Sequence, residues 1–208
     1  MLSLFVILLN LPSTRQEVVP RPPFSDQLWG FEISLEEANE LATRSGLDLR
    51  IPQNLPPSYI LTNVRADGFR VSPDGNTLPG VILLVFAPSS TNKEDLIPSK
   101  FPEVQAFRLY VSGGSTGHEE SFLNAKANQG PYDIFNAEGE AIGQGNQVVR
   151  GEAITVNGLF AVHSPGFEDD RPGPIREINW VDGGTRFLLT SDAEAFPLAR
   201  LLPIAESI

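Results

Sequence analysis

The C-terminal part of the chain, residues 175–208, restricts the possible folds more than any other segment. Ile178 and Trp180 alternate with polar neighbours, Asp182-Gly183-Gly184 follows, and residues 187–190 form a second apolar stretch. Alternation with a period of two is typical of a strand with one buried face, and glycines supply the positive φ of tight turns. The segment therefore predicts a β-hairpin with Trp180 on its buried face. Residues 197–208 then predict a short helix, which Pro203 should bend.

The remaining elements point to one fold class. Ser34 and Glu37 form a capping box and Gly46 supplies a stop, which predicts a helix between them. A second helix is predicted over residues 117–128, and strands over 47–51, 59–64, 81–86, 107–111, 132–135, 148–149, 153–156 and 159–162. Asn157-Gly158 is a hairpin turn between the last two strands. Because hairpins outnumber possible βαβ crossovers, we expect an α+β fold, an antiparallel β-sheet with a few helices packed on one face.

The N-terminus divides the chain into three parts. Residues 1–12 are apolar up to Leu11, too short for a spanning helix of about 20 residues, and no Lys or Arg precedes the run. Three readings stay open: a remnant of a membrane anchor that starts upstream, a signal-like segment, or an ordinary buried strand or helix. Residues 13–30 are predicted as a Pro-rich linker and residues 31–208 as a single α+β globular domain. This order is typical of an extracytoplasmic protein that is membrane-tethered or secreted.

Charge and composition exclude several classes of function. The net charge is −11, with twelve acids and nine bases in residues 1–115 and fourteen acids and six bases in residues 116–208. A phosphate-tracking surface needs clustered cations, and this sequence contains no run of Lys or Arg, so we expect no nucleic-acid partner. The chain has no cysteine, which excludes thiol nucleophiles, disulfides and iron–sulfur clusters.

Two histidine-containing motifs were considered for catalysis. His163-Ser164 follows a predicted strand and has acids nearby, so a hydrolase site is one reading. Because Ser164 precedes proline and no Gly-x-Ser-x-Gly elbow occurs, a strand-end histidine is favoured. His118-Glu119-Glu120 matches the zinc motif H-E-x-x-H for two residues only, since position 122 is Phe, and acids at a helix start explain it better.

Two further motifs favour loops over ligand sites. Glu168-Asp169-Asp170 is the densest acidic cluster, but it lacks the alternating spacing of a calcium loop. Gly139, Gly143, Gly145 and Gly151 form a glycine-rich stretch with neither a following helix nor the Lys-Ser/Thr of a phosphate loop. We therefore predict no catalytic residues, no metal site and no cofactor.

Five aromatic residues form the remaining candidate site. They are Trp29, Tyr59, Phe107, Tyr110 and Trp180, and they could line a groove for an apolar ligand. Aromatic residues at strand positions also build ordinary cores, which is the alternative for this set. Only a structure separates the two readings.

Four stretches carry a resemblance to a known family. They are Leu35-Glu36-Glu37-Ala38, Ile51-Pro52-Gln53-Asn54-Leu55-Pro56-Pro57-Ser58-Tyr59-Ile60-Leu61, Ile178-Asn179-Trp180 and Ile204-Ala205-Glu206-Ser207-Ile208. They resemble an uncharacterised extracytoplasmic domain of bacterial and archaeal membrane proteins, including anti-sigma-factor-like and sporulation-associated proteins. The family's proline turn has Gly where this chain has Ser58, and its terminal helix lacks a proline like Pro203. The resemblance covers residues 31–64 and 151–208, and it implies an extracytoplasmic location but no reaction.

These observations lead to two function hypotheses of different classes. The first is a non-enzymatic extracytoplasmic binding or sensory module of a membrane-associated protein, whose partner is another protein at the membrane surface. The second is a carrier or chaperone for a lipid or other apolar ligand. A hydrolase with an unrecognised site is a third. A continuous apolar cavity favours the carrier, and a filled core with an exposed binding face favours the module.

Overall fold

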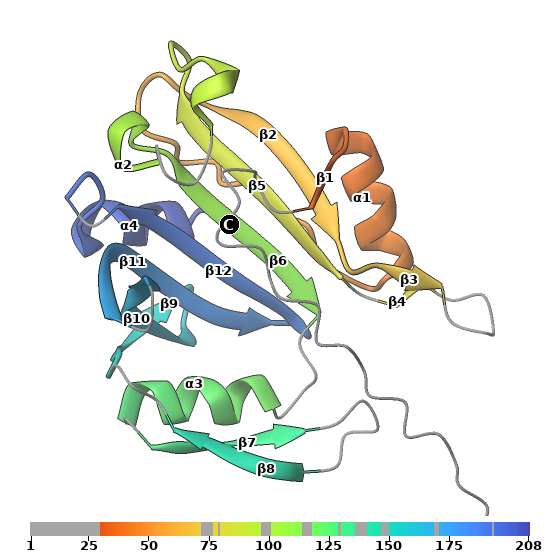
Figure 1. Cartoon of the computed structure of the whole chain (residues 1–208), viewed down its shortest axis with the longest axis vertical. Helices are drawn as coiled ribbons and strands as arrows, with labels where there is room; N and C mark the ends of the chain where they lie inside the picture. Colours follow the sequence, from red (N-terminus) through yellow and green to blue (C-terminus); the bar gives the residue numbers. More distant parts are fainter. Residues whose placement is uncertain are drawn as a thin grey trace, which may run out of the picture.

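An eight-stranded antiparallel sheet forms the centre of the structure, a computed structural model (Figure 1). The structure describes residues 30–71, 77–78, 80–96, 101–113, 118–128, 130–135, 141–146, 150–168, 171–192 and 194–208. In spatial order the strands are β1 (Phe31–Glu32), β2 (Tyr59–Asp67), β5 (Val81–Pro88), β6 (Phe107–Gly113), β12 (Thr185–Asp192), β11 (Arg171–Asp182), β10 (Leu159–Glu168) and β9 (Glu152–Val156). The sheet is open, with β1 at one edge and β9 at the other.

Smaller elements surround this sheet. Two separate two-stranded sheets pair β3 (Arg70–Val71) with β4 (Thr77–Leu78) and β7 (Pro131–Phe135) with β8 (Ala141–Asn146). The helices are α1 (Leu35–Arg44), α2 (Phe101–Val104), α3 (His118–Asn128) and α4 (Leu198–Ala205), and η1 (Lys93–Asp95) is a 3₁₀ turn. The predicted α+β class with an antiparallel sheet is confirmed.

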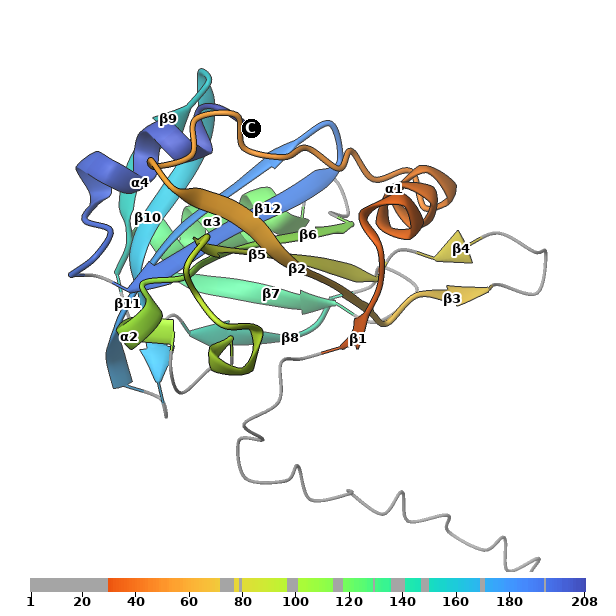
Figure 2. The ribbon, with the colours of Figure 1, turned by 90° about the horizontal axis from the view of Figure 1, so that it is seen from above.

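The main helices are divided between the two faces of the sheet, so the expectation that they pack on one face is wrong. Ala38 of α1 and Leu201 of α4 join the main core on what we call the first face (Figure 2). Leu123 of α3 packs against Val162 on the opposite, second face. Both faces are covered because central strands are apolar on both sides: Leu84 is buried on the first face and Leu83 on the second.

The local signals read from the sequence form as expected at both ends of the described chain. The backbone N–H of Glu37 donates to Ser34 Oγ at 3.1 Å, and that of Ser34 donates to Glu37 Oε2 at 2.7 Å, so the capping box of α1 is complete. Gly183 and Gly184 have φ of 56° and 82° in the turn between β11 and β12. That turn brings Trp180 opposite Phe187, and Trp180 is 2% exposed, as predicted.

The strand predicted over residues 47–51 is wrong. The segment is irregular, and its apolar residues Leu47, Leu49 and Ile51 pack against the first-face core without a neighbouring strand. The N–H of Asp48 donates to Thr185 Oγ1 at 2.9 Å, so a side chain takes the place of a strand partner. The alternation of apolar residues correctly predicted that one side of this segment is buried, but it wrongly predicted backbone pairing with a neighbouring strand.

The other predicted elements lie close to their observed bounds. Residues 117–128 contain α3, and the strands predicted over 59–64, 81–86, 107–111, 132–135, 153–156 and 159–162 are all present. The strand predicted over 148–149 and residues 1–29 lie outside the described residues. No helix within the described ranges is both long and apolar enough to cross a membrane.

Candidate functional site

Of the five aromatic residues proposed as a groove, three lie in one core and one lies on the opposite face of the sheet. Tyr59, Phe107 and Trp180 lie in the first-face core with exposures of 8%, 0% and 2%. Tyr110 is half-buried on the second face, and Trp29 lies outside the described residues. Tyr59, Phe107 and Trp180 therefore belong to an ordinary packed core, which was the alternative to a ligand groove.

Ring packing shows how closely this core is filled. The rings of Phe86 and Phe107 stack with centroids 4.8 Å apart, and Phe196 meets the Phe107 ring edge-on at 5.4 Å. Trp180 stacks on Phe187 at 5.2 Å. These separations are those of aromatic rings in direct contact. The space between the sheet, α1 and α4 is therefore occupied by the protein's own side chains.

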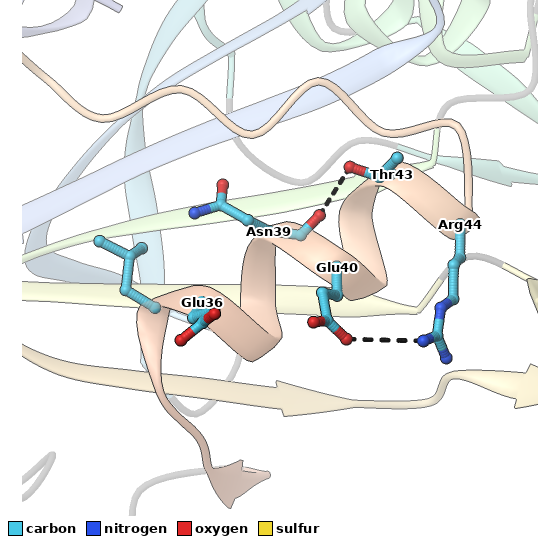
Figure 3. Close-up of a pocket in the computed structure, with 6 residues that line it drawn as sticks. Glu36, Asn39, Glu40, Thr43 and Arg44 are labelled. Atoms are coloured by element: carbon cyan, nitrogen blue, oxygen red, sulfur yellow. Dashed lines mark hydrogen bonds and ion pairs between the residues drawn. The ribbon is translucent and has the colours of Figure 1, made fainter.

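A hollow of about 610 Å³ lies along the outer side of α1 (Figure 3). Its lining residues, Leu35, Glu36, Asn39, Glu40, Thr43 and Arg44, all come from this one helix. Glu40 and Arg44 pair along the helix at 3.5 Å. Because a single exposed helix surface supplies the whole lining, this hollow encloses no ligand-sized space and carries no site.

A second hollow, of about 500 Å³, lies where α3, β9 and β10 meet. The lining combines Asn124, Ala127 and Asn128 of α3 with the segment Arg150–Gly151–Glu152, Ala153 of β9 and Phe160 of β10. Phe160 is 41% exposed and is one of three exposed large apolar residues in the described part of the chain. Helix α3 and the β9–β10 hairpin thus build an opening that is lined by both apolar and polar side chains.

Among the described residues, the strand beside this hollow is an unpaired edge of the main sheet. β9 pairs with β10 on one side and ends the strand order on the other. Asn157 and Gly158, with φ of 51° and 80°, form the two-residue turn between these strands. In such a hairpin the residues next to the turn form a hydrogen-bonded pair, and the pattern then alternates. The N–H and C=O groups of Ala153 and Thr155 therefore point away from β10, toward the open edge.

Gly151 fixes the start of β9 against α3. Its N–H donates to the carbonyl oxygen of Lys126 at 2.9 Å. A Cβ at this position would lie 2.3 Å from Cγ1 of Val162, so a side chain does not fit without rearrangement. The chain entering β9 can pass this close to β10 because residue 151 is glycine.

A buried ion pair holds α3 on the sheet. Lys126 Nζ lies 2.7 Å from Glu177 Oε2 of β11, and the two side chains are 5% and 17% exposed. Glu177 lies between Thr190 and Ser164 on the neighbouring strands, and both hydroxyl oxygens are buried without a hydrogen-bond partner among the described residues. The contact beneath α3 therefore combines the apolar cluster of Leu123, Ala127 and Val162 with the buried Lys126–Glu177 pair.

The motifs considered for catalysis are not assembled into a site. His163 and Ser164 are consecutive strand residues, so their side chains project from opposite faces of the sheet. His163 Nδ1 lies 3.9 Å from Glu152 Oε2, and burial, together with the nearby charge of Arg176, lowers the pKa of His163 below its ordinary value. Ser164 is fully buried on the second face. A nucleophile and a base are therefore not brought together at this motif.

The remaining motifs lie at element ends or within strands, and Gly143 and Gly145, expected in a loop, lie inside β8. His118 begins α3, as the helix-start reading of His118-Glu119-Glu120 predicts. Glu168 ends β10, whereas Asp169, Asp170 and Gly139 lie outside the described residues. In the part of the chain that the structure describes, no group of three or more His, Asp or Glu side chains is placed to hold a metal ion.

Sequence reasoning predicted the strands at the candidate site but not the site itself. Leu159 and Ala161 face the core, and side chains alternate along a strand. Their spacing therefore indicates that Phe160, between them, points away from that core. That β9 is an edge strand, and that α3 returns beside it, depend on contacts between distant segments. No protein-family model, curated protein or solved structure matches this chain.

Proposed function

We propose that this domain is a non-enzymatic protein-binding module, and that it binds through the open edge of β9 and the hollow beside it. The observation that carries the proposal is the contrast between a filled core and an open sheet edge next to a hollow of about 500 Å³. Exposed edge strands are common docking sites for other polypeptides, because their unpaired backbone groups accept a further strand.

The same contrast argues against a carrier of apolar ligands. A lipid needs an enclosed and mostly apolar cavity. The sheet's first face is instead filled by stacked rings such as Phe86 and Phe107. The hollow at β9 opens to the surface and has Arg150 and Glu152 on its rim. Burying an acyl chain there would leave charged groups against hydrocarbon, which costs free energy.

Sequence features support an extracytoplasmic location for this module. The apolar residues before Leu11 and the Pro-rich linker are typical of a tethered or exported domain, and the family resemblance implies the same compartment. The partner in this proposal is another protein at the membrane surface.

Native mass spectrometry of the full chain, purified from its own host, tests the proposal. We expect a polypeptide partner to remain bound to the wild type and to be lost from a Phe160→Asp variant. Ile60→Asp is the matched control, since Ile60 is a similarly exposed apolar strand residue, 48% against 41% for Phe160. A lipid of uniform mass retained by the wild type would overturn the proposal in favour of the carrier. A polypeptide lost equally from both variants would also overturn the assignment to this surface.

A further inference from the structure

The partner's chemistry can be inferred from the geometry and charge around β9. We propose that β9 takes an extended, positively charged segment of another protein as a ninth strand, with one apolar side chain of that segment in the Phe160 hollow. This inference rests on the proposed function and names the class of partner for the same surface.

The backbone of β9 is suited to strand addition. Its five residues, Glu152–Val156, contain no proline and no lysine, and their pairing with β10 shows no bulge. Natural edge strands are commonly blocked by those three features. The opposite edge, β1, is only two residues long and offers little to pair with. Of the two edges of the main sheet, β9 is the one that remains available along several residues.

Side-chain phase places an anchor site next to this edge. Thr155 lies opposite Phe160 and Ala153 lies opposite Val162, so all four side chains project on the second face. Ala153 and Phe160 line the hollow, together with Ala127 of α3. A strand added to β9 would direct every second side chain to this face, directly beside the hollow. An aliphatic or aromatic residue at one such position would cover the exposed part of the Phe160 ring.

Charge identifies the segment as basic. Residues 116–208, which include α3 and the strands from β7 to β12, contain fourteen acidic and six basic residues, a net charge of −8. Beside the hollow, Lys126 is buried and paired with Glu177, and Arg150 lies on the rim beside Glu152. Glu152, at the start of β9, keeps 72% of its side chain exposed. The net charge therefore attracts a cationic segment to this half of the chain, whereas a second copy of the chain, itself at −11, is repelled.

A displayed library of random ten-residue peptides is the probe for this inference. It is selected on the wild-type full chain and counter-selected on a Thr155→Pro variant. Proline at 155 removes the N–H that points to the open edge and leaves the bonds to β10 in place. We expect enriched peptides with net positive charge and β-forming residues around one apolar anchor. Enrichment of acidic or helix-forming peptides would overturn the inference.

Synthetic copies of the enriched peptides then separate backbone pairing from other binding. Losing one hydrogen bond should weaken binding by about tenfold for Thr155→Pro. Thr155→Val keeps the N–H and should bind within about twofold of the wild type. Peptides N-methylated on alternate residues give a second measurement that does not depend on variant folding. Methylation of one alternate set should abolish binding and methylation of the other should preserve it, because a strand pairs through one edge.

The outcomes distinguish this inference from the function on which it rests. Peptides that bind Thr155→Pro as well as the wild type, and that tolerate both methylation sets, would refute strand addition. The proposed function would still stand if the co-purified polypeptide is lost from Phe160→Asp. Concentration-dependent dimers of the wild type that are absent from Thr155→Pro would instead identify a second copy as the occupant and overturn the inference.

Discussion

The Lys126–Glu177 pair should decide whether α3 stays on the sheet. The perturbations are Lys126→Met, which leaves a largely buried carboxylate, and Glu177→Gln, which leaves a buried ammonium. Removing one partner of a buried pair lowers the free energy of unfolding by about 3–5 kcal/mol, because the remaining charge is uncompensated. Since Glu177 keeps 17% of its side chain exposed, we expect about 3 kcal/mol for each single variant.

The double variant separates the pair from its surroundings. In Lys126→Met/Glu177→Gln neither charge remains, so the loss should be about 2 kcal/mol smaller than the sum of the two single losses. The measurement is the free energy of unfolding from guanidinium titrations of the full chain, with amide hydrogen exchange resolved along the sequence. Exchange should increase more in α3 than in β5, because the pair connects α3 to β11 and does not contact β5.

Loss of the ion pair should also affect binding at the hollow, since α3 supplies Ala127 to its wall. A single variant that is still folded should therefore bind a β9 peptide more weakly than the wild type. Single variants as stable as the wild type, or a coupling free energy within about 0.5 kcal/mol of zero, would refute the reasoning. Such a result would mean that apolar contacts such as that of Leu123 with Val162 hold α3 by themselves.

Three further outcomes follow from single sites. Trp180→Ala should lower the free energy of unfolding by about 3–5 kcal/mol, because the indole is buried against Phe187, and an unchanged melting temperature would contradict this. Gly151→Ala should cost about 1–3 kcal/mol in the same assay through overpacking against Val162, whereas Gly143→Ala, with no atom within 4 Å of the added Cβ, should be neutral. Burial and Arg176 lower the pKa of His163, so its unfolded form binds a proton more readily. Stability should therefore fall as the pH drops from about 6.5, the unfolded value, toward the lower folded pKa. His163→Gln should remove that part of the pH dependence, and identical pH profiles would exclude the assignment.

Local signals in the sequence predicted most of the described elements. The capping box at Ser34, the Asn157-Gly158 turn and the glycines at 183–184 each act within a few residues, so their conformations follow from local chemistry. The error at residues 47–51 has a different origin. Leu47, Leu49 and Ile51 alternate because one side faces the core, but pairing needs a neighbouring strand, which only the tertiary structure supplies.

The candidate site depends on long-range order for the same reason. Ala127 and Phe160 are far apart along the chain and meet at the hollow because α3 packs on the second face. The aromatic set could not be assigned from the sequence either. Tyr59 and Tyr110 both occur in strands, yet strand register places Tyr59 in the first-face core and Tyr110 on the second face. A shift of one residue would exchange the two faces.

The net charge of the chain opposes pairing between the open β9 edges of two copies. An edge of alternating apolar and β-branched residues would normally favour pairing between copies. Antiparallel self-pairing centred on Ile154 would place Glu152 opposite Val156 of the second copy, so no ion pair would offset the repulsion between two chains of −11. Salt screens that repulsion and also screens the attraction of a basic segment. Raising the ionic strength should therefore weaken peptide binding at β9 while increasing self-association, two opposite trends that apolar contacts alone would not produce.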